Sequence, residues 1–422
     1  MTKHIHGGDV YKYDHCLDFS ANCNPLGTPQ SVKKAIIDSV DGLSDYPRVG
    51  CGPLKEAIAV YEQTQKEYLI CGNGAADLIF SLCRAKNPKK ALLLAPTFAE
   101  YEQALVSVGC EITRYYLEET ADFCVEENYL QLLKTEKPDI IFLCNPNNPT
   151  GITMPQELPE KILASCSELG IFMVVDECFL DFVKDPDRHT LKGKLAEHPN
   201  LFLLKAFTKR YAIPGVRLGY GFCSDRKVLE RMEAVTQPWN VSTMAQQAGL
   251  AALKETEYVE KGRQIIFQES AWLKEEMTKL GLKVYPSEAN YIFFRGPEDL
   301  FEKCVPKGIL IRDCSNYPGL QKGYYRVAVK LHEQNEKLVR VLTELVGKTI
   351  IIGGIKSESK DFLSLTLFID NYENIENKKY SKRKEGTKKW QKRLWCRGQC
   401  PMQEKAYWQP VCAGSLSRTD TG

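Results

Sequence analysis

Several short, uninterrupted apolar runs divide the first half of the chain and limit what it can fold into. They lie at 91–96 (ALLLAP), 140–146 (IIFLCNP), 172–177 (FMVVDE), 201–207 (LFLLKAF) and 218–223 (LGYGFC). Apolar runs without polar alternation are typical of parallel strands covered on both faces. Between them, segment 158–170 has a leucine and isoleucine stripe that ends at Gly170, which is typical of a capped helix. The pattern predicts an α/β fold with a mostly parallel sheet and ligand-binding residues at the carboxyl ends of its strands.

The pattern changes after about residue 248. A long helix is predicted over 248–281, and strands are predicted near 283–295, 308–313 and 324–330. We expect a smaller α+β domain here, to which the amino-terminal arm adds. The expected organisation is an arm over 1–28, a large domain over 29–247, a small domain over 248–347 and a tail over 348–422.

Composition and charge exclude several classes of function. A net charge of +2 gives no reason to expect a nucleic acid as partner, and no stretch has the apolar length of a signal peptide or a membrane span. The 16 cysteines are scattered along apolar segments without a C-x-x-C pair, which is typical of reduced core thiols. We therefore expect a cytoplasmic protein with no metal site and no disulfide framework.

Segment 203–220, LLKAFTKRYAIPGVRLGY, places Lys209 eight residues before Arg217 across a Pro-Gly turn. A lysine can form a Schiff base with an aldehyde, and an arginine fork can hold a phosphate through two hydrogen bonds. This is the spacing of a lysine and an arginine that bind pyridoxal 5′-phosphate (PLP). Lys205 is also nearby, but its spacing to Arg217 is wrong. Taken alone, the pair could equally be two solvated surface cations.

Three further motifs agree with a PLP site, in a fixed order along the chain. CGNGAAD at 71–77 precedes a helical pattern, so backbone N–H groups at Gly74 and Ala75 can hold a phosphate. NPNNPTG at 145–151 follows an apolar run, and its Asn148 can hydrogen-bond the phenolate oxygen of the cofactor. Asp176 ends another apolar run, where a carboxylate can keep the pyridine nitrogen protonated. Each motif alone could be an ordinary turn.

The order GNGA, PTFAEY, NPNNPTG, DECF, TK and GVRLGY resembles the fold-type-I PLP enzymes of the histidinol-phosphate aminotransferase branch, over almost all of 4–346. Within that branch the chain is most similar to the threonine-phosphate decarboxylases. The segments that carry this likeness are 6–9 (HGGD), 17–27 (LDFSANCNPLG), 98–101 (FAEY), 208–220, 309–320 and 324–330. The resemblance implies decarboxylation of L-threonine O-3-phosphate in cobalamin biosynthesis. The alternative activity is that of a histidinol-phosphate aminotransferase, and a third interpretation is a binding protein without catalysis.

The resemblance also implies a role for individual residues. Lys209 and Asp176 would be catalytic, and Asp176 would pair with the ring nitrogen. The cofactor-binding residues would be Gly74, Ala75, Phe98, Asn148, Asp176, Thr208, Lys209, Arg217 and, from the neighbouring subunit of a homodimer, Tyr46. The substrate-binding residues would be His6, Gly7, Asn22, Asn148, Arg312 and Arg326.

Some of these positions have simpler interpretations, and two others depart from the family pattern. His6 could be a terminal residue without a role, and Phe98 an ordinary core aromatic. Arginines inside apolar strands, such as Arg312, need an anionic partner. Phe179 stands where transaminating relatives have a tyrosine that donates to the cofactor, which leaves Asn148 as the donor. Ala206 replaces a small hydroxyl residue, so Thr208 would take that contact with the phosphate.

Residues 348–422 do not continue the pattern. The stretch at 378–400 is basic and dotted with aromatic residues, but it has no sustained helical or strand period. Its composition predicts a disordered tail rather than a nucleic-acid arm. Plausible codons for 389–420, read one base out of frame, spell a peptide similar to the amino terminus of cobyric acid synthase. We hypothesise that the tail is an out-of-frame translation, in which Cys396, Cys400 and Cys412 bind nothing.

Overall fold

A seven-stranded sheet forms the centre of the larger part of the protein, in a computed structural model that describes residues 7–13 and 15–346. In spatial order its strands are β2 (Leu69–Gly72), β8 (Gly219–Phe222), β7 (Leu201–Ala206), β6 (Phe172–Asp176), β5 (Ile140–Cys144), β3 (Lys90–Ala95) and β4 (Glu111–Tyr116). The strands from β7 to β4 pair in parallel. Every residue of β5, β6 and β7 is buried, so the predicted mostly parallel sheet of the α/β fold is confirmed.

Strand β8 departs from the parallel pattern. It pairs antiparallel with both of its neighbours, β7 and β2, although its apolar sequence resembles that of the parallel strands. The segment between β7 and β8 holds only the short helix α7 (Phe207–Arg210) and a 3-10 turn at Pro214–Val216. A parallel connection needs a longer crossover, usually with a full helix. The chain therefore turns back, and this turn carries the lysine and the arginine singled out above.

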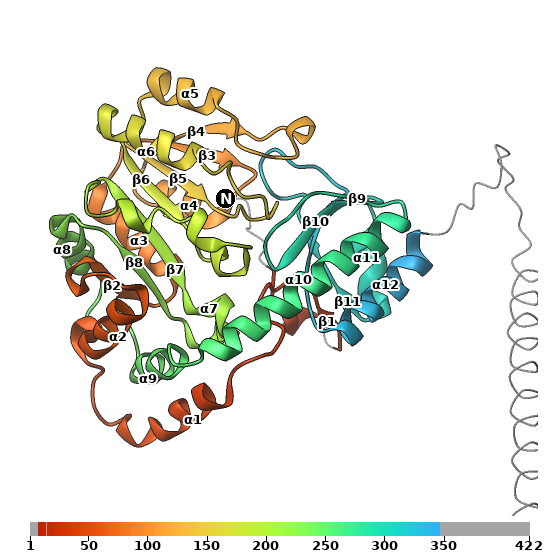
Figure 1. Cartoon of the computed structure of the whole chain (residues 1–422), viewed down its shortest axis with the longest axis horizontal. Helices are drawn as coiled ribbons and strands as arrows, with labels where there is room; N and C mark the ends of the chain where they lie inside the picture. Colours follow the sequence, from red (N-terminus) through yellow and green to blue (C-terminus); the bar gives the residue numbers. More distant parts are fainter. Residues whose placement is uncertain (1–6, 14, 347–422) are drawn as a thin grey trace, which may run out of the picture. The chain divides into compact units, whose positions relative to one another are not determined.

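Helices cover both faces of the sheet (Figure 1). Buried side chains on one face come from α2 (Gly52–Glu62), α5 (Asn128–Glu136), α6 (Leu158–Leu169) and α9 (Thr243–Ala252). Those on the other face come from α3 (Ala75–Lys86), α4 (Ala99–Val106) and α8 (Arg226–Val235). The strands supply alternate residues to the two cores, as the pleat requires: Met173 faces one core and Val174 the other. Helix α1 (Gln30–Asp38) packs on α9.

A second sheet and a third core lie in the carboxyl-terminal part of the described chain. The sheet is antiparallel, in the order β12 (Arg312–Asp313), β13 (Tyr324–Ala328), β10 (Tyr291–Arg295) and β9 (Lys283–Val284). Helices α10 (Thr256–Lys279), α11 (Leu300–Cys304) and α12 (His332–Val346) supply side chains to its core. The amino-terminal strand β1 (Leu17–Asp18) pairs in parallel with β11 (Ile309–Leu310), and Phe19 enters the same core.

The prediction of one long helix over 248–281 is wrong, because the chain forms two helices there. Helix α9 begins at the cap of Ser242, whose hydroxyl accepts a hydrogen bond from the amide of Ala245 at 3.1 Å. It packs on α1 and α2, whereas α10 packs on α12 and β9. Helix α10 runs on to the third core, which it joins through Leu273 and Met277, whereas α9 stays in the first core. The chain changes direction between them at Glu255, which has non-helical backbone angles (φ −88°, ψ 54°). The helical period of the sequence continues through this break and hides it.

Several sequence expectations concern His6 and the tail after 347, which lie outside the described residues. Within the described ranges, no helix is long and apolar enough to cross a membrane. The same ranges hold no group of three or more potential metal ligands. Their 13 cysteines are free thiols, most of them buried.

Candidate active site

A cavity of about 300 Å³ lies where the carboxyl ends of the parallel strands face the second sheet. Cys144, Asp176 and Ala206, which end β5, β6 and β7, all line it. Most of the residues singled out from the sequence meet there: Gly7, Asn22, Ala75, Phe98, Asn148, Asp176, Thr208, Lys209, Arg217, Arg312 and Arg326. They come from the arm, the large sheet and the second sheet, so the fold gathers side chains that are more than 300 residues apart.

One end of the cavity is built to receive an oxyanion. Gly74 is the N-cap of α3 and has a left-handed backbone (φ 86°), which leaves backbone N–H groups at the start of the helix. A Cβ atom at Gly74 would lie 2.5 Å from Nη2 of Arg217, so only glycine lets the guanidinium approach this turn. Arg217 is further held by donating from Nη1 to the carbonyl of Pro214 at 3.1 Å. A helix start, a glycine and an arginine together fit a phosphate.

Asp176 lies buried at the floor of the cavity. Its carboxylate accepts hydrogen bonds from the hydroxyl of Tyr101 at 2.6 Å and from the amide of Cys178 at 2.9 Å. Burial raises the pKa of Asp176, although these two hydrogen bonds oppose the shift. A cationic N–H donor from a ligand would offset the cost of the buried negative charge. The pyridinium nitrogen of PLP is such a donor, so the residues present fit this group.

Tyr101 is a site residue that the sequence did not single out. Its ring stacks on Phe142 at a centroid distance of 5.0 Å and meets the edge of Phe98 at 5.5 Å. Burial raises the pKa of Tyr101 well above its usual value, so its hydroxyl stays protonated and donates to Asp176. The only sequence signal was its place in the segment FAEY. Nothing in that segment pointed to a carboxylate 75 residues further along.

Lys209 reaches the same cavity from α7. Its Nζ lies 5.8 Å from the ring centroid of Phe179, and that ring packs edge-to-face on Tyr291. Phe179 therefore supplies an apolar wall with no hydroxyl. Asn148 has its amide oxygen engaged by Nη1 of Arg326. Its remaining hydrogen-bonding group is the amide nitrogen, which is a donor, as the proposed contact with the phenolate oxygen requires.

Two buried arginines from the second sheet also line the cavity. Arg326 donates a hydrogen bond from Nη2 to the carbonyl oxygen of Ser20 at 2.9 Å. When the side-chain amide of Asn22 turns its oxygen toward Arg326, the Nε of Arg326 donates to that amide oxygen at 3.2 Å. Arg312 donates to the side chain of Asn316 at 2.8 Å, and its guanidinium lies 5.1 Å from the ring centroid of Tyr317. These contacts fix both guanidinium groups in a cavity with space for an anionic ligand.

The structure brings the arm to the cavity but leaves Tyr46 outside it. The amide of Gly8 donates to the hydroxyl of Ser20 at 2.7 Å, and a Cβ on Gly7 would lie 2.5 Å from the carbonyl oxygen of Ser20. This close approach explains Gly7, and the positive φ of Gly8 (84°) explains the second glycine of HGGD. Tyr46 is 78% exposed and stacks on Trp239 at 4.4 Å. Its predicted contact with a neighbouring subunit stays a prediction.

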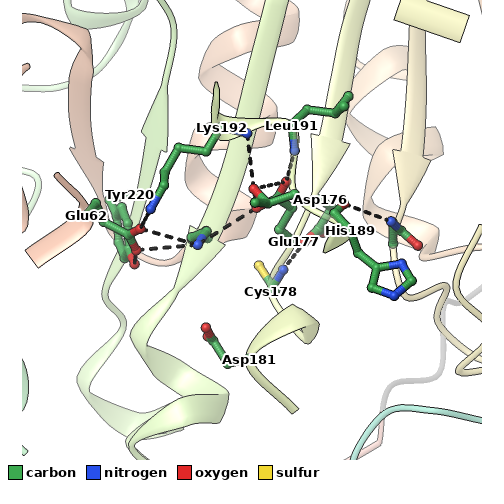
Figure 2. A network of polar contacts seen from close by, with 12 residues as sticks. Glu62, Asp176, Glu177, Cys178, Asp181, His189, Leu191, Lys192 and Tyr220 are labelled. Carbon is green, nitrogen blue, oxygen red and sulfur yellow. Dashed lines mark hydrogen bonds and ion pairs between the residues drawn. The ribbon is translucent and has the colours of Figure 1, made fainter. Parts of the chain in front are cut away.

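A buried ionic network lies behind Asp176, on the other face of the strands (Figure 2). Glu62 accepts from Tyr220 at 2.7 Å, from Lys192 at 3.1 Å and from Lys205 at 3.4 Å. Burial would raise the pKa of Glu62, but the surrounding cations, first of all Lys205, lower it to about 2. This network was not foreseen, because its members are far apart in the sequence.

Lys205 is a fixed cation of this network. Nζ of Lys205 also lies 3.8 Å from Glu177, whose carboxylate accepts from Thr190 at 2.9 Å. Burial alone would lower the pKa of Lys205, but Glu62 and Glu177 outweigh burial and raise it. A protonated amine is not a nucleophile. Lys205 is therefore held as a cation by the two carboxylates of this network.

Comparisons with known proteins agree with this geometry. Residues 14–342 match the family model of the class I and II aminotransferases. The chain is 37% identical over 353 residues to a threonine-phosphate decarboxylase of Salmonella typhimurium, covering 81% of this chain and 96% of the relative. A protein of Caldanaerobacter subterraneus named as a putative threonine-phosphate decarboxylase is also 37% identical, with 82% and 95% covered.

A solved structure shares the fold. The histidinol-phosphate aminotransferase from Clostridium acetobutylicum superposes with a TM-score of 0.73 at 30% identity, over 78% of this chain and 99% of that one. The family match, the identity to full-length relatives and the shared fold all point the same way. The chain therefore belongs to the class I and II aminotransferase family.

Proposed function

We propose that the protein is a PLP-dependent decarboxylase that converts L-threonine O-3-phosphate into (R)-1-amino-2-propanol O-2-phosphate and CO₂ in cobalamin biosynthesis. The observation that carries the proposal is one cavity with two kinds of anion-binding end. Arg217 and the start of α3 suit a cofactor phosphate, whereas Arg312 and Arg326 suit a substrate with two further anionic groups. The relatives named as threonine-phosphate decarboxylases support this substrate.

The chain's own residues would hold PLP in a defined way. Lys209 would bind the cofactor covalently, Asp176 would pair with the ring nitrogen, and Phe98 would lie against the ring. Asn148 would donate to the phenolate oxygen. Arg217, Thr208 and the Gly74–Ala75 turn would hold the phosphate. When bound, PLP supplies an electron sink for the bond that breaks at the substrate Cα.

Substrate orientation then decides which bond breaks, because only a bond perpendicular to the cofactor ring can pass its electrons into it. Arg326 would hold the carboxylate, and Arg312 with His6 would hold the substrate phosphate. By holding the two anionic ends, Arg326 and Arg312 would set the orientation of the substrate, and an orientation with the carboxylate out of the ring plane would favour loss of CO₂. Lys209 or a water molecule would return a proton to Cα. Burial of both guanidinium groups keeps water from competing for these anions.

The proposal includes a homodimer in the cytoplasm. Tyr46 would reach the cofactor phosphate of the neighbouring subunit. The phosphate-binding residue Arg217 is exposed in the single chain, so a neighbouring subunit could approach it. A set of exposed apolar side chains near Tyr46 in the sequence supports an interface: Ile37 (68% exposed), Val40 (48%), Leu43 (56%) and Val49 (66%). The buried thiols of the described cysteines fit a reducing compartment.

A histidinol-phosphate aminotransferase is the second candidate. The fold of the Clostridium acetobutylicum enzyme favours it, and the same cofactor residues would serve both reactions. Phe179 and the glycine pair of the arm favour the decarboxylase.

The two activities can be measured side by side. The purified protein is incubated with PLP and L-threonine O-3-phosphate, and CO₂ release is compared with glutamate formed from 2-oxoglutarate. We expect CO₂ without glutamate. A second incubation replaces threonine phosphate by histidinol phosphate. Formation of glutamate in that incubation, together with no CO₂ from threonine phosphate, would reject the decarboxylase.

A further inference from the structure

Glu100 is an acidic residue of the cavity that the proposed function does not use. It lies in the first turn of α4, between Phe98, which faces the cavity, and Tyr101, which donates to Asp176. It lines the same cavity as the buried arginines and is partly buried. Glu102, two residues further on, instead pairs with Arg114 of β4 at 2.7 Å. The first turn of α4 thus contributes one of its two acidic groups to the lining of the cavity.

The charged groups around Glu100 come from three other elements. Lys209 of α7 and Arg312 of β12 attract its negative charge, and Asp176 of β6 repels it. Burial raises the pKa of Glu100 first of all, a backbone hydrogen bond, Lys209 and Arg312 oppose that rise, and the result is about 7. Both forms of the carboxyl group are therefore accessible near neutral pH.

The two forms have opposite effects on an oxyanion. An ionised carboxylate only accepts hydrogen bonds and repels a phosphate, whereas a neutral carboxyl group donates one hydrogen bond. A dianion that enters beside Arg312 further favours the neutral form, because like charges in a water-poor site cannot both persist at low cost. Binding of the anion and binding of a proton at Glu100 are therefore linked.

We propose that Glu100 is a specificity-determining residue: its carboxyl group, which lines the cavity together with Arg312, takes up one proton when an oxyanion dianion binds. The neutral carboxyl group then donates to the anion. The identity of that anion as the phosphate of the substrate rests on the proposed function. The proton comes from solvent and returns to solvent when the product phosphate leaves, so the cycle is balanced. The pocket thereby binds the dianion near the ionised Asp176 without also holding a negative charge on Glu100.

Sulfate is the probe that tests this linkage, because it stays dianionic across the pH range of interest and does not react. The PLP-loaded protein is titrated with sodium sulfate at several pH values, and binding is followed by the visible absorbance of the bound cofactor. Because one proton must bind with the anion, the dissociation constant of the wild-type protein should rise about tenfold per pH unit at pH values above the pKa of Glu100 in the loaded protein. Glu100→Gln stays neutral, so its dissociation constant should not change over that range.

Two further variants make the result decisive. Glu102→Gln removes a carboxylate from the same helix outside the cavity, and it should keep the wild-type pH dependence. Glu100→Ala removes both the charge and the donor, so it should bind sulfate independently of pH but more weakly than Glu100→Gln. Equal affinity of these two variants would overturn the donated hydrogen bond. An unchanged pH dependence in Glu100→Gln would overturn the whole inference, because the proton that binds with sulfate would then be taken up by another group.

The test is independent of turnover. Cofactor content and melting temperature of each variant are measured first, and a variant that loses either is replaced by Glu100→Met, which is also uncharged and should likewise bind independently of pH. If the protein forms no CO₂ from threonine phosphate but shows the expected sulfate titration, the proposed substrate is wrong and the role of Glu100 stands. If CO₂ forms but sulfate binding to the wild type does not depend on pH, the proposed substrate stands and the proposed role of Glu100 is wrong.

Discussion

Arg312 and Arg326 occupy directly paired positions on the neighbouring antiparallel strands β12 and β13, and both are only 5% exposed. Like charges opposite each other on one face of a sheet destabilise it, and buried guanidinium groups need anionic partners. The hydrogen bonds of Arg326 go to neutral oxygens of Ser20 and Asn148. Placing two buried guanidinium groups opposite each other costs free energy in the fold, and the proposed substrate, with its two anionic groups, would offset that cost.

Lysine at either arginine position should impair the enzyme although it keeps the charge. A lysine cannot donate two parallel hydrogen bonds, so the substrate loses both affinity and orientation. We expect Arg312→Lys and Arg326→Lys each to lower kcat/KM at least tenfold, about 1.4 kcal/mol. Steady-state kinetics with threonine phosphate measures the loss. Full activity in both variants would mean that other residues hold the anionic ends.

Asp176→Asn should leave the fold intact and remove most of the activity. An amide cannot keep the ring nitrogen of the cofactor protonated, and loss of a comparable preorganised electrostatic contact costs roughly 3 to 4 kcal/mol of barrier. The neutral amide also avoids the burial cost that raises the pKa of Asp176, so the melting temperature should not fall. Thermal unfolding and kcat are compared with Tyr101→Phe, which removes one hydrogen bond to Asp176 and should cost less. Near-normal turnover of Asp176→Asn would contradict the assigned role.

Lys209, and not Lys205, should carry the cofactor. Reduction with borohydride followed by peptide mapping should place the pyridoxyl label on Lys209. Lys205→Met should keep that label but lose roughly 3 to 5 kcal/mol of stability, because Glu62 and Glu177 would lose their buried cationic partner. A label on Lys205 in the wild type would refute the assignment.

The sequence predicted the parts of the site that depend on local pattern. Asp176 ends an apolar run, and Lys209 and Arg217 flank a turn, so their places at strand ends follow from local structure. The roles of Tyr101 and Glu62 could not be predicted in this way, because their partners Asp176 and Lys205 are brought to them only by packing of the sheet. The antiparallel direction of β8 and the break before α10 were missed for the same reason. The spacing of apolar residues along the sequence does not show in which direction a strand runs, or against which core a helix packs.

The buried network makes stability depend on acid in a specific way. The pKa of Glu62 falls from 4.5 to about 2 on folding. The stabilising contribution of the ionised carboxylate to the free energy of unfolding is therefore fully present above about pH 4.5. That contribution, about 3 kcal/mol, should be lost as the pH falls toward 2. Urea unfolding between pH 5 and 3 should show a shallower loss of stability in Glu62→Gln than in the wild type. Equal slopes in the two proteins would show that Glu62 is not held ionised by Lys205.

Deleting residues 348–422 should leave decarboxylation and solubility unchanged. The described fold closes with α12, whose Leu338 and Leu342 are fully buried in the third core, and with Val346 packed against it. The residues beyond lie outside the described ranges, and we predict from their lysine-rich composition that they do not pack on this core. The truncated and full-length proteins are compared by CO₂ release, by size-exclusion chromatography and by binding to heparin, which only the tail should promote. Loss of activity or of dimerisation on truncation would show that the tail packs on the enzyme, and it would reject the hypothesis of an out-of-frame translation. Sequencing the gene for a shifted or missing stop between codons 347 and 389 tests that hypothesis directly.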